Sequence, residues 1–179
     1  MGFKVKIVGT QTILKRVAAT LAGITMLVVN VDSAMAVEQT RPTPSCNLVR
    51  WASDEAFDLT SLRGKVVYVD FWASWCSSCV QSFPFLNELE RELGSRGFVA
   101  LGINLDEQKD DAARFLAKHS VGFAIATNPN MLCPKAFGVT GMPAAYLIDR
   151  KGNIRHEHLG FRSGQAISLR TAVEQLLSE

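Results

Sequence analysis

The chain has 179 residues, of which 47% are hydrophobic and 20% are charged, and its formal net charge is +2. This is the composition of a globular protein that can bury a core, and it excludes an intrinsically disordered chain. The small net charge, without a basic run or a pattern of stacking aromatic residues, gives no reason to expect a nucleic-acid partner.

The first 36 residues have the pattern of a secretory signal peptide. Basic residues lie near the start, an apolar stretch follows at 17–31, and Ala34 and Ala36 are small residues at the two positions that a signal peptidase reads. The apolar stretch has 15 residues, fewer than the about 20 that cross a bilayer as a helix. We therefore expect cleavage after Ala36 and a periplasmic or otherwise extracytoplasmic protein. An uncleaved membrane anchor is the main alternative.

Loss of residues 1–36 removes four of the 19 basic and one of the 17 acidic residues, so the remaining chain has 15 and 16 and a net charge of −1. The positive charge therefore belongs to the leader and not to the working domain. Export also brings the four cysteines into an oxidising compartment, where disulfides form and persist.

The rest of the chain divides into a short tether and one domain. Residues 37–47 contain Pro42 and Pro44 and little apolar periodicity, so we expect a flexible tether there. Residues 48–179 contain no linker, repeat or low-complexity tract, which indicates a single domain. Its expected elements, in chain order, are a strand at 66–71, a helix at 77–93, a strand at 98–105, a helix at 107–119, a strand at 123–126, a short helix at 131–137, strands at 145–148 and 154–159 joined by a hairpin turn, and a last helix that begins near Ser163. This order predicts an α/β fold with a mixed sheet covered on both faces.

Two cysteines separated by two residues lie between an expected strand and an expected helix. Cys76 and Cys79 can close a small disulfide ring. The free N–H groups and the dipole of a helix N-terminus stabilise an anion, so Cys76 is expected to ionise more easily than a free thiol, whose pKa is about 8.5. The thiolate is the nucleophile in thiol–disulfide exchange, so we expect Cys76 to attack and Cys79 to resolve the mixed disulfide.

A C-x-x-C pair alone is also compatible with half of a zinc site or with a structural bridge. A zinc site needs further ligands at ordered spacings, and the remaining cysteines and histidines do not supply them. We therefore expect no metal site, and no cofactor beyond the redox-active disulfide of Cys76 and Cys79.

The residues around this motif resemble the active site of the thioredoxin superfamily. The run from Val69 to Cys76 is similar to the thioredoxin active-site strand almost residue for residue, and Pro84 matches the proline that kinks the following helix in that family. The run Gly141-Met142-Pro143 resembles the cis-proline loop that faces the cysteine pair. The resemblance implies a thioredoxin-like fold and thiol–disulfide exchange at the motif.

The same resemblance implies a substrate-binding surface beside the disulfide. A cis peptide bond before Pro143 would hold an extended backbone edge where a client peptide pairs. Met142 would belong to this edge, and Trp75 would shield the sulfurs. An ordinary trans proline in a loop is the alternative at Pro143.

The finer resemblance is to the exported, TlpA/ResA-like branch of that superfamily, and it covers residues 48–179. The run at 58–67 looks like the lead-in to the catalytic strand of that branch, and the expected helix and strand between Leu105 and Thr127 look like its helix–strand insertion. The resemblance implies that the clients are thiols and disulfides of exported proteins, such as the cysteines of apocytochrome c or of copper sites. It also implies a membrane thiol carrier as the electron donor.

The chain departs from that branch at one acidic position. Many members have an acid three residues after the second cysteine, where this chain has Ser82. The acid is instead Asp70, inside the apolar run 66–71. Because a buried carboxyl has a raised pKa, we expect Asp70 to accept the proton of Cys79 while that thiol resolves the mixed disulfide.

The other two cysteines leave two possibilities open. Cys46 and Cys133 form a second disulfide that joins the tether to the helix before the cis-proline loop, or both are free. Counting thiols on denatured, unreduced protein distinguishes the two.

The leading hypothesis is an exported oxidoreductase that reduces disulfides in its clients. Two alternatives remain: an oxidant that installs disulfides, and a copper-assembly factor that binds Cu(I) through Cys76 and Cys79. Ser77 and Ser78, between the two cysteines, do not decide the direction of electron flow.

Overall fold

The computed structural model describes residues 40–179 of the chain. In this part of the chain the strands form one sheet, in the order β1-β8-β7-β4-β5-β6-β2-β3. The strands are β1 (Arg41–Pro42), β2 (Asn47–Arg50), β3 (Ala56–Asp58), β4 (Val66–Trp72), β5 (Phe98–Asn104), β6 (Ala124–Thr127), β7 (Ala144–Ile148) and β8 (Asn153–Leu159). The α-helices are α2 (Phe83–Leu93), α3 (Lys109–Leu116), α4 (Leu132–Phe137) and α5 (Ala166–Ser178), and the 3-10 helices are η1 (Leu59–Leu62), η2 (Cys79–Ser82), η3 (Gly94–Arg96) and η4 (Ser163–Gln165).

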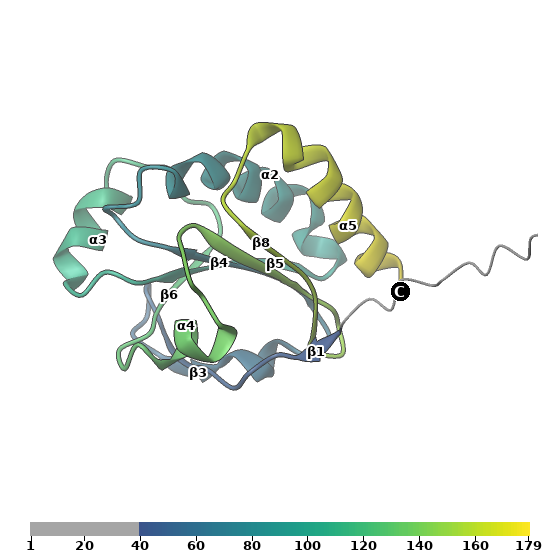
Figure 1. The fold of residues 1–179 in the computed structure, drawn as a ribbon, viewed down its shortest axis with the longest axis horizontal. Coiled ribbons are helices and arrows are strands. Elements are labelled where there is room, and N and C mark those ends of the chain that lie inside the picture. The colour runs from purple at the N-terminus through teal and green to yellow at the C-terminus, as the bar shows by residue number, and fades with distance from the viewer. Residues whose placement is uncertain (1–39) are drawn as a thin grey trace, which may run out of the picture. The chain divides into compact units, whose positions relative to one another are not determined.

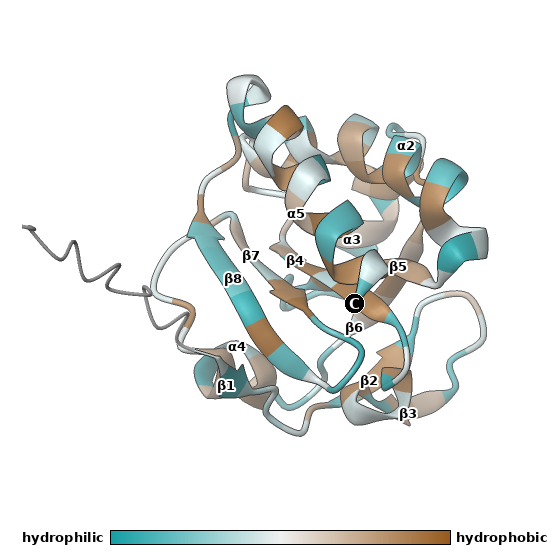
Figure 2. Ribbon diagram, turned by 90° about the vertical axis from the view of Figure 1, so that its right-hand side faces the viewer, coloured by the Kyte–Doolittle hydropathy of each residue, from teal (hydrophilic) through white to brown (hydrophobic). Residues whose placement is uncertain are grey.

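Strand β4 lies in the middle of the sheet and is buried along its whole length. It pairs in parallel with β5 and antiparallel with β7, so the sheet is mixed. A short run of valine and aromatic residues is typical of a strand that is covered on both faces. In Figure 2 the central strands are largely hydrophobic, whereas β8 is largely hydrophilic.

Alternate side chains of β4 enter two separate cores, because successive residues of a strand point to opposite faces. Tyr68 and Trp72 belong to the core that includes the inner side chains of α2, and Val69 and Phe71 belong to the core that includes those of α4. Figure 1 shows the same layers, with α2 and α5 over one face of the sheet and α4 on the other. The expected mixed sheet flanked by helices is confirmed.

The flexible tether expected at 37–47 is wrong from Arg41 onward. Strand β1 pairs with β8, and Cys46 forms a disulfide with Cys133. Strands β2 and β3 then complete the far edge of the sheet. The segment lacks apolar periodicity because its order comes from pairing with distant parts of the chain and from a covalent bond.

The signal peptide or membrane anchor expected at 1–36 lies outside the described residues. Within residues 40–179, no helix has the length and apolar character that crossing a membrane requires.

The helix expected from Ser77 starts later and in two steps. Residues 79–82 form the 3-10 turn η2, and the α-helix α2 begins at Phe83. The Phe83 N–H donates to the Val80 carbonyl in the 3-10 pattern. Pro84 has no N–H with which to close the α-helical bond to that same carbonyl, which explains the tighter first turn.

Candidate active site at the Cys76–Cys79 disulfide

The cysteine pair lies where β4 ends and η2 begins. The chain turns there, with the Cys76 N–H donating to the Ala73 carbonyl at 3.1 Å and the Cys79 N–H donating to the Cys76 carbonyl at 3.0 Å. The two sulfurs form a disulfide of 2.03 Å, with the Cα atoms 5.4 Å apart. Cys79 is fully buried and Cys76 is 6% exposed, so Cys76 is the cysteine that a client sulfur can approach.

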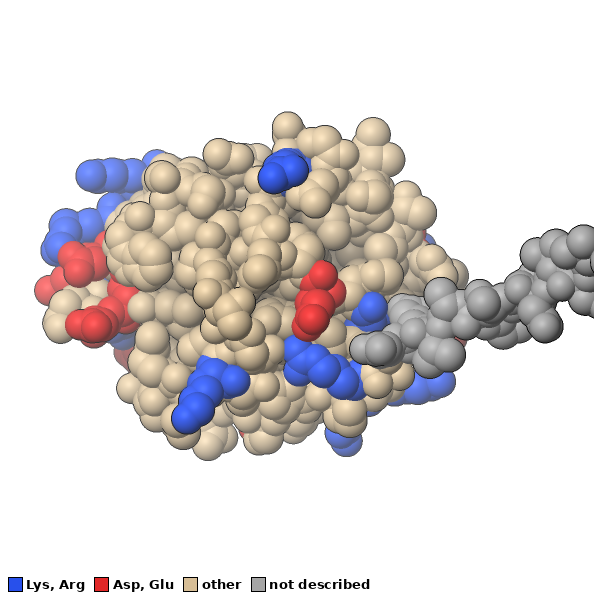
Figure 3. Space-filling view, in the orientation of Figure 1, with Lys and Arg blue, Asp and Glu red and all other residues tan. Residues whose placement is uncertain are grey.

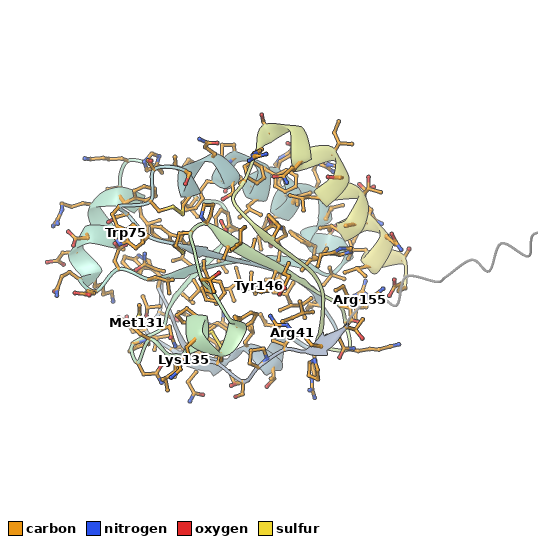
Figure 4. The ribbon with its side chains drawn as sticks, viewed as in Figure 1. Arg41, Trp75, Met131, Lys135, Tyr146 and Arg155 are labelled. Carbon is orange, nitrogen blue, oxygen red and sulfur yellow. A yellow bond between two sulfur atoms is a disulfide. The ribbon has the colours of Figure 1, made fainter. Side chains whose placement is uncertain are left out.

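The two tryptophans of the motif have opposite surroundings. Trp72 is fully buried and packs against the rings of Phe83 and Phe115. Trp75 is 68% exposed, next to Cys76 in the chain. In the view of Figure 4, Trp75 and the exposed Met131 lie toward the same end of the molecule. Trp75 is therefore available for contact with another molecule, and Trp72 is part of the core.

Asp106 holds the loop in front of the cysteines. Its carboxylate accepts a hydrogen bond from the Ser74 N–H at 2.9 Å and from the Ser74 hydroxyl at 2.7 Å, and the Asn104 amide donates to it at 2.7 Å. Trp72 lies opposite Asn104 in the parallel pair β4–β5, so the carboxyl ends of both strands meet at this edge. Sequence reasoning missed Asp106, although a carboxylate just after a strand parallel to the catalytic one is a pattern that indicates it.

Asp70 is buried, and it points to the same face of β4 as Tyr68 and Trp72. The core on this face also includes Cys76 and Cys79. Burial raises the pKa of Asp70 to about 7, and the hydrogen bond from the Ser82 hydroxyl, at 2.7 Å, acts in the opposite direction. The expected burial of Asp70 is confirmed. A carboxyl with a pKa near neutrality can both take up and release a proton at physiological pH.

Tyr68 and His158 form a second polar pair on this face. The Tyr68 hydroxyl lies 3.0 Å from Nε2 of His158. Asp70 is opposite Ala145, and Ala145 is opposite His158, so the small Ala145 separates the acid from the histidine. Burial lowers the pKa of His158, whereas burial and then the charge of Asp70 raise the pKa of Tyr68. The spacing of the histidines in the sequence gave no indication of this pair, which depends on sheet register.

The Met142–Pro143 peptide bond is cis. Pro143 is buried immediately before β7, and Phe71 opposite Ala144 brings this loop beside the end of β4 from which the cysteine motif leaves. The Pro143 carbonyl accepts a hydrogen bond from the Gly160 N–H at 2.7 Å. Met142 is half-buried and packs against the core that includes both cysteines of the motif. The loop and the disulfide therefore lie close together at the carboxyl end of β4.

The structure joins Cys46 and Cys133, the pair that the sequence left open. Their Cα atoms are 5.3 Å apart, their separation along the chain is 87 residues, and both side chains are buried. Asn128 supports the same junction, since its side chain accepts from the Cys133 N–H at 2.9 Å and donates to the Asn47 carbonyl at 3.0 Å. The N-terminal segment is thus fastened to α4, the helix that precedes the cis-proline loop.

The match to a family model covers the whole of this site. A model described as Redoxin matches residues 36–176. The chain belongs to the Redoxin family. The matched range includes both disulfides, Asp70 and the cis-proline loop, so the Redoxin match and the geometry concern the same part of the chain.

Individual relatives and solved structures agree with this result. A crystal structure from Chlorobium tepidum, assigned as thiol:disulfide interchange protein DsbE, is 36% identical with a TM-score of 0.73 and covers 77% of this chain and 96% of its own. A thiol:disulfide interchange protein of the thioredoxin family from Chlorobium tepidum TLS is 26% identical with a TM-score of 0.66, covering 77% and 97%. The thiol-disulfide oxidoreductase ResA of Geobacillus thermodenitrificans is 32% identical over 97 residues, which are 54% of this chain and 56% of ResA.

The match thus spans little more than half the length of that curated relative. Together these findings confirm the resemblance to the thioredoxin superfamily and its ResA-like members. Within the described residues, no group of three or more His, Cys, Asp or Glu side chains is arranged to hold a metal ion.

Proposed function

We propose that this chain is a thiol–disulfide oxidoreductase that exchanges disulfides with exported proteins through Cys76 and Cys79. The observation that carries the proposal is the Cys76–Cys79 disulfide at the carboxyl end of the central strand β4, with Cys76 as the less buried cysteine and Asp70 on the adjoining buried face. The printed names of two relatives, thiol-disulfide oxidoreductase ResA and thiol:disulfide interchange protein DsbE, support the same chemistry.

The reaction begins with the reduced chain. The Cys76 thiolate attacks a client disulfide, the client S–S bond breaks, and a mixed disulfide forms while one client thiolate leaves. The Cys79 thiol then gives its proton to Asp70 and attacks the sulfur of Cys76. The Cys76–Cys79 bond forms and the second client thiolate leaves, so two electrons have passed to the client. The proton on Asp70 returns to solvent.

We further propose that the chain works outside the cytoplasm as a reductant. An exported reductant needs a continuing supply of electrons, for which a membrane thiol carrier is the expected donor. Clients of matching chemistry are the cysteine pairs of apocytochrome c or of copper sites. No cofactor is required beyond the Cys76–Cys79 disulfide, because thiol–disulfide exchange moves both electrons through sulfur.

The client would bind beside the disulfide, over Trp75, Met142 and Pro143. Support comes from the exposure of Trp75 and from the meeting of the cis-proline loop with the cysteine motif at one edge. Figure 3 shows a broad area without Lys, Arg, Asp or Glu on the face turned to the viewer, which suits an uncharged stretch of client chain.

The reduction potential tests the direction of electron flow. The full chain is equilibrated with defined thiol buffers, and the reduced fraction of the Cys76–Cys79 pair is measured. A value near or below about −230 mV supports a reductant, and a value near about −120 mV identifies an oxidant and rejects the proposed direction.

The control is a Cys46→Ser/Cys133→Ser chain, in which only one redox couple remains. A Cys76→Ser chain should transfer no electrons to a disulfide substrate. If the Cys76→Ser chain retains exchange activity, the proposed site is wrong.

A further inference from the structure

The Ser82 hydroxyl lies between two acceptors in the interior. Its Oγ is 2.7 Å from Oδ2 of Asp70 and 2.9 Å from the carbonyl oxygen of Cys79. Ser82 and Asp70 are each 1% exposed, so solvent does not compete for these bonds. A serine hydroxyl has one proton, and it cannot donate to both oxygens at once.

The charge of Asp70 decides which bond Ser82 makes. An ionised carboxylate only accepts hydrogen bonds, and a buried anion without a donor is very costly, so Ser82 then donates to Asp70. A protonated Asp70 can donate its own O–H to Oγ of Ser82, which frees the hydroxyl proton for the Cys79 carbonyl. Each change in the protonation of Asp70 therefore changes the hydrogen bond at the first residue of η2.

The cross-strand neighbours of Asp70 have no side chain that could replace Ser82 as its hydrogen-bond donor. The residues opposite Asp70 on β5 and β7 are Gly102 and Ala145, which do not titrate. Gly102 is closely packed, because a Cβ there would lie 2.8 Å from the terminal methyl carbon of Ile125 and 3.1 Å from the Phe123 ring.

The titratable groups near Asp70 come from β4, η2 and β8. Within the described residues they are Tyr68, whose pKa the Asp70 charge raises, Cys79, whose carbonyl shares the Ser82 hydroxyl with Asp70, and, through its bond to Tyr68, His158. Within the described residues, the hydrogen bond that stabilises the Asp70 anion comes from Ser82.

We propose that Ser82 is a positioning residue for the resolving step, which holds Asp70 ready as the proton acceptor and transmits its protonation to the turn that carries Cys79. This inference rests on the proposed function, because it requires the proton of the Cys79 thiol to reach Asp70 as the mixed disulfide is resolved. Ser82 does not touch the reacting sulfurs in this account, and it acts through Asp70.

Removal of the hydroxyl has a specific consequence. The Asp70 anion loses its hydrogen bond, so the pKa of Asp70 rises further above its ordinary value. Fewer molecules then carry the basic form of Asp70 at neutral pH, and the resolving step slows in proportion. A change of about one pKa unit lowers that fraction about tenfold at a pH below both pKa values.

Stopped-flow reaction of the reduced protein with dithiobis(nitrobenzoate) separates the two steps. Attack by Cys76 breaks the reagent's disulfide and releases one coloured thionitrobenzoate anion, and attack by Cys79 on the mixed disulfide releases the second. The full chain carries Cys46→Ser/Cys133→Ser, so Cys76 and Cys79 are its only thiols.

The variants are Ser82→Ala, Ser82→Thr and, as a matched control, Ser77→Ala. Ser77 is in the same motif, but its side chain is exposed. In the chain with native Ser82, the second phase should accelerate with pH through an inflection near pH 7.

Ser82→Ala should move this inflection about one pH unit upward and slow the second phase about fivefold at pH 7 and about tenfold at pH 6, with the first phase unchanged. Ser82→Thr should restore the inflection, and Ser77→Ala should leave it in place. An unmoved inflection in Ser82→Ala would overturn the inference alone. Failure of the native chain to release the first anion would overturn the proposed function as well.

A measurement without any Ser82 variant keeps the inference testable if Ser82→Ala does not fold. Carbon-13 NMR of the oxidised chain follows the Asp70 carboxyl and the Cys79 carbonyl carbon during a pH titration. Both resonances should change with one midpoint, because the same hydroxyl serves both groups. If the resonance of the Cys79 carbonyl carbon stays constant while Asp70 titrates, the inference is overturned.

Discussion

Replacement of Asp70 by asparagine should stabilise the oxidised protein by an amount that grows with pH. The carboxyl is completely buried, and burial raises its pKa from 3.8 to about 7. The unfolded chain ionises near the ordinary value, so between the two values the unfolded state releases a proton that the folded state keeps. Stability is therefore lost as pH rises through this range.

The magnitude follows from the size of the shift. Each pKa unit corresponds to about 1.4 kcal/mol, so a rise from 3.8 to about 7 lowers the stability above pH 7 by about 4 kcal/mol. Well below pH 3.8 the carboxyl is protonated in both states and contributes no such penalty. Asparagine has a similar shape and does not ionise, so the Asp70→Asn chain lacks this pH dependence.

Denaturant unfolding of the oxidised full chain and of Asp70→Asn, between pH 4 and pH 8, measures the difference. The gain in unfolding free energy should be about 4 kcal/mol larger at pH 8 than at pH 4. Replacing a carboxyl oxygen by an amide nitrogen can also change the unfolding free energy by a constant amount, and that amount cancels in this comparison. A difference that does not change with pH would show that Asp70 is ionised normally in the folded state, and the reasoning about its burial would be refuted.

Three further outcomes test the site. Cys79→Ser should accumulate a mixed disulfide between Cys76 and a client peptide, detected by mass spectrometry under non-reducing conditions, whereas Cys76→Ser should form none. The Cys46→Ser/Cys133→Ser chain should lose about 4–5 kcal/mol in denaturant unfolding, since the bond closes a loop of 87 residues; a loss below about 1 kcal/mol would contradict this. Asp106→Ala should free the Ser74 loop and slow the first phase of thiol exchange, while Asn87→Ala, which removes a comparable exposed side-chain bond to the 120–122 loop, should not.

Local patterns in the sequence were sufficient to predict the centre of the fold. The run 66–71 has the composition of a strand buried on both faces, and the structure has β4 at Val66–Trp72 in mid-sheet. Strands β1 and β2 could not be predicted in this way. They have two and four residues, they include a proline, and their partners lie about 80 to 110 residues further along the chain.

In the site, too, residues set by local sequence were predictable and residues set by long-range pairing were not. Cys76, Cys79 and Asp70 were predictable because each lies within one strand–turn–helix segment. Asp106 was missed because its contact with Ser74 spans 32 residues and depends on the parallel pairing of β4 and β5. Ser82 could have been predicted, since a residue three positions after Cys79 in a helical turn points to the same side as that cysteine.

Asp70 and the Cys46–Cys133 disulfide have opposite effects on stability and lie on opposite faces of the sheet. The acid belongs to the face with α2, and the disulfide lies in the core that includes α4. Sites in separate cores without a shared partner contribute nearly independently to stability. Ionisation of Asp70 costs about 4 kcal/mol above pH 7, which is a large share of the about 5–15 kcal/mol that stabilises a typical domain. The disulfide contributes a similar amount with the opposite sign. A covalent bond on one face thus helps the other face to retain a buried acid with a raised pKa, which the proposed resolving step requires.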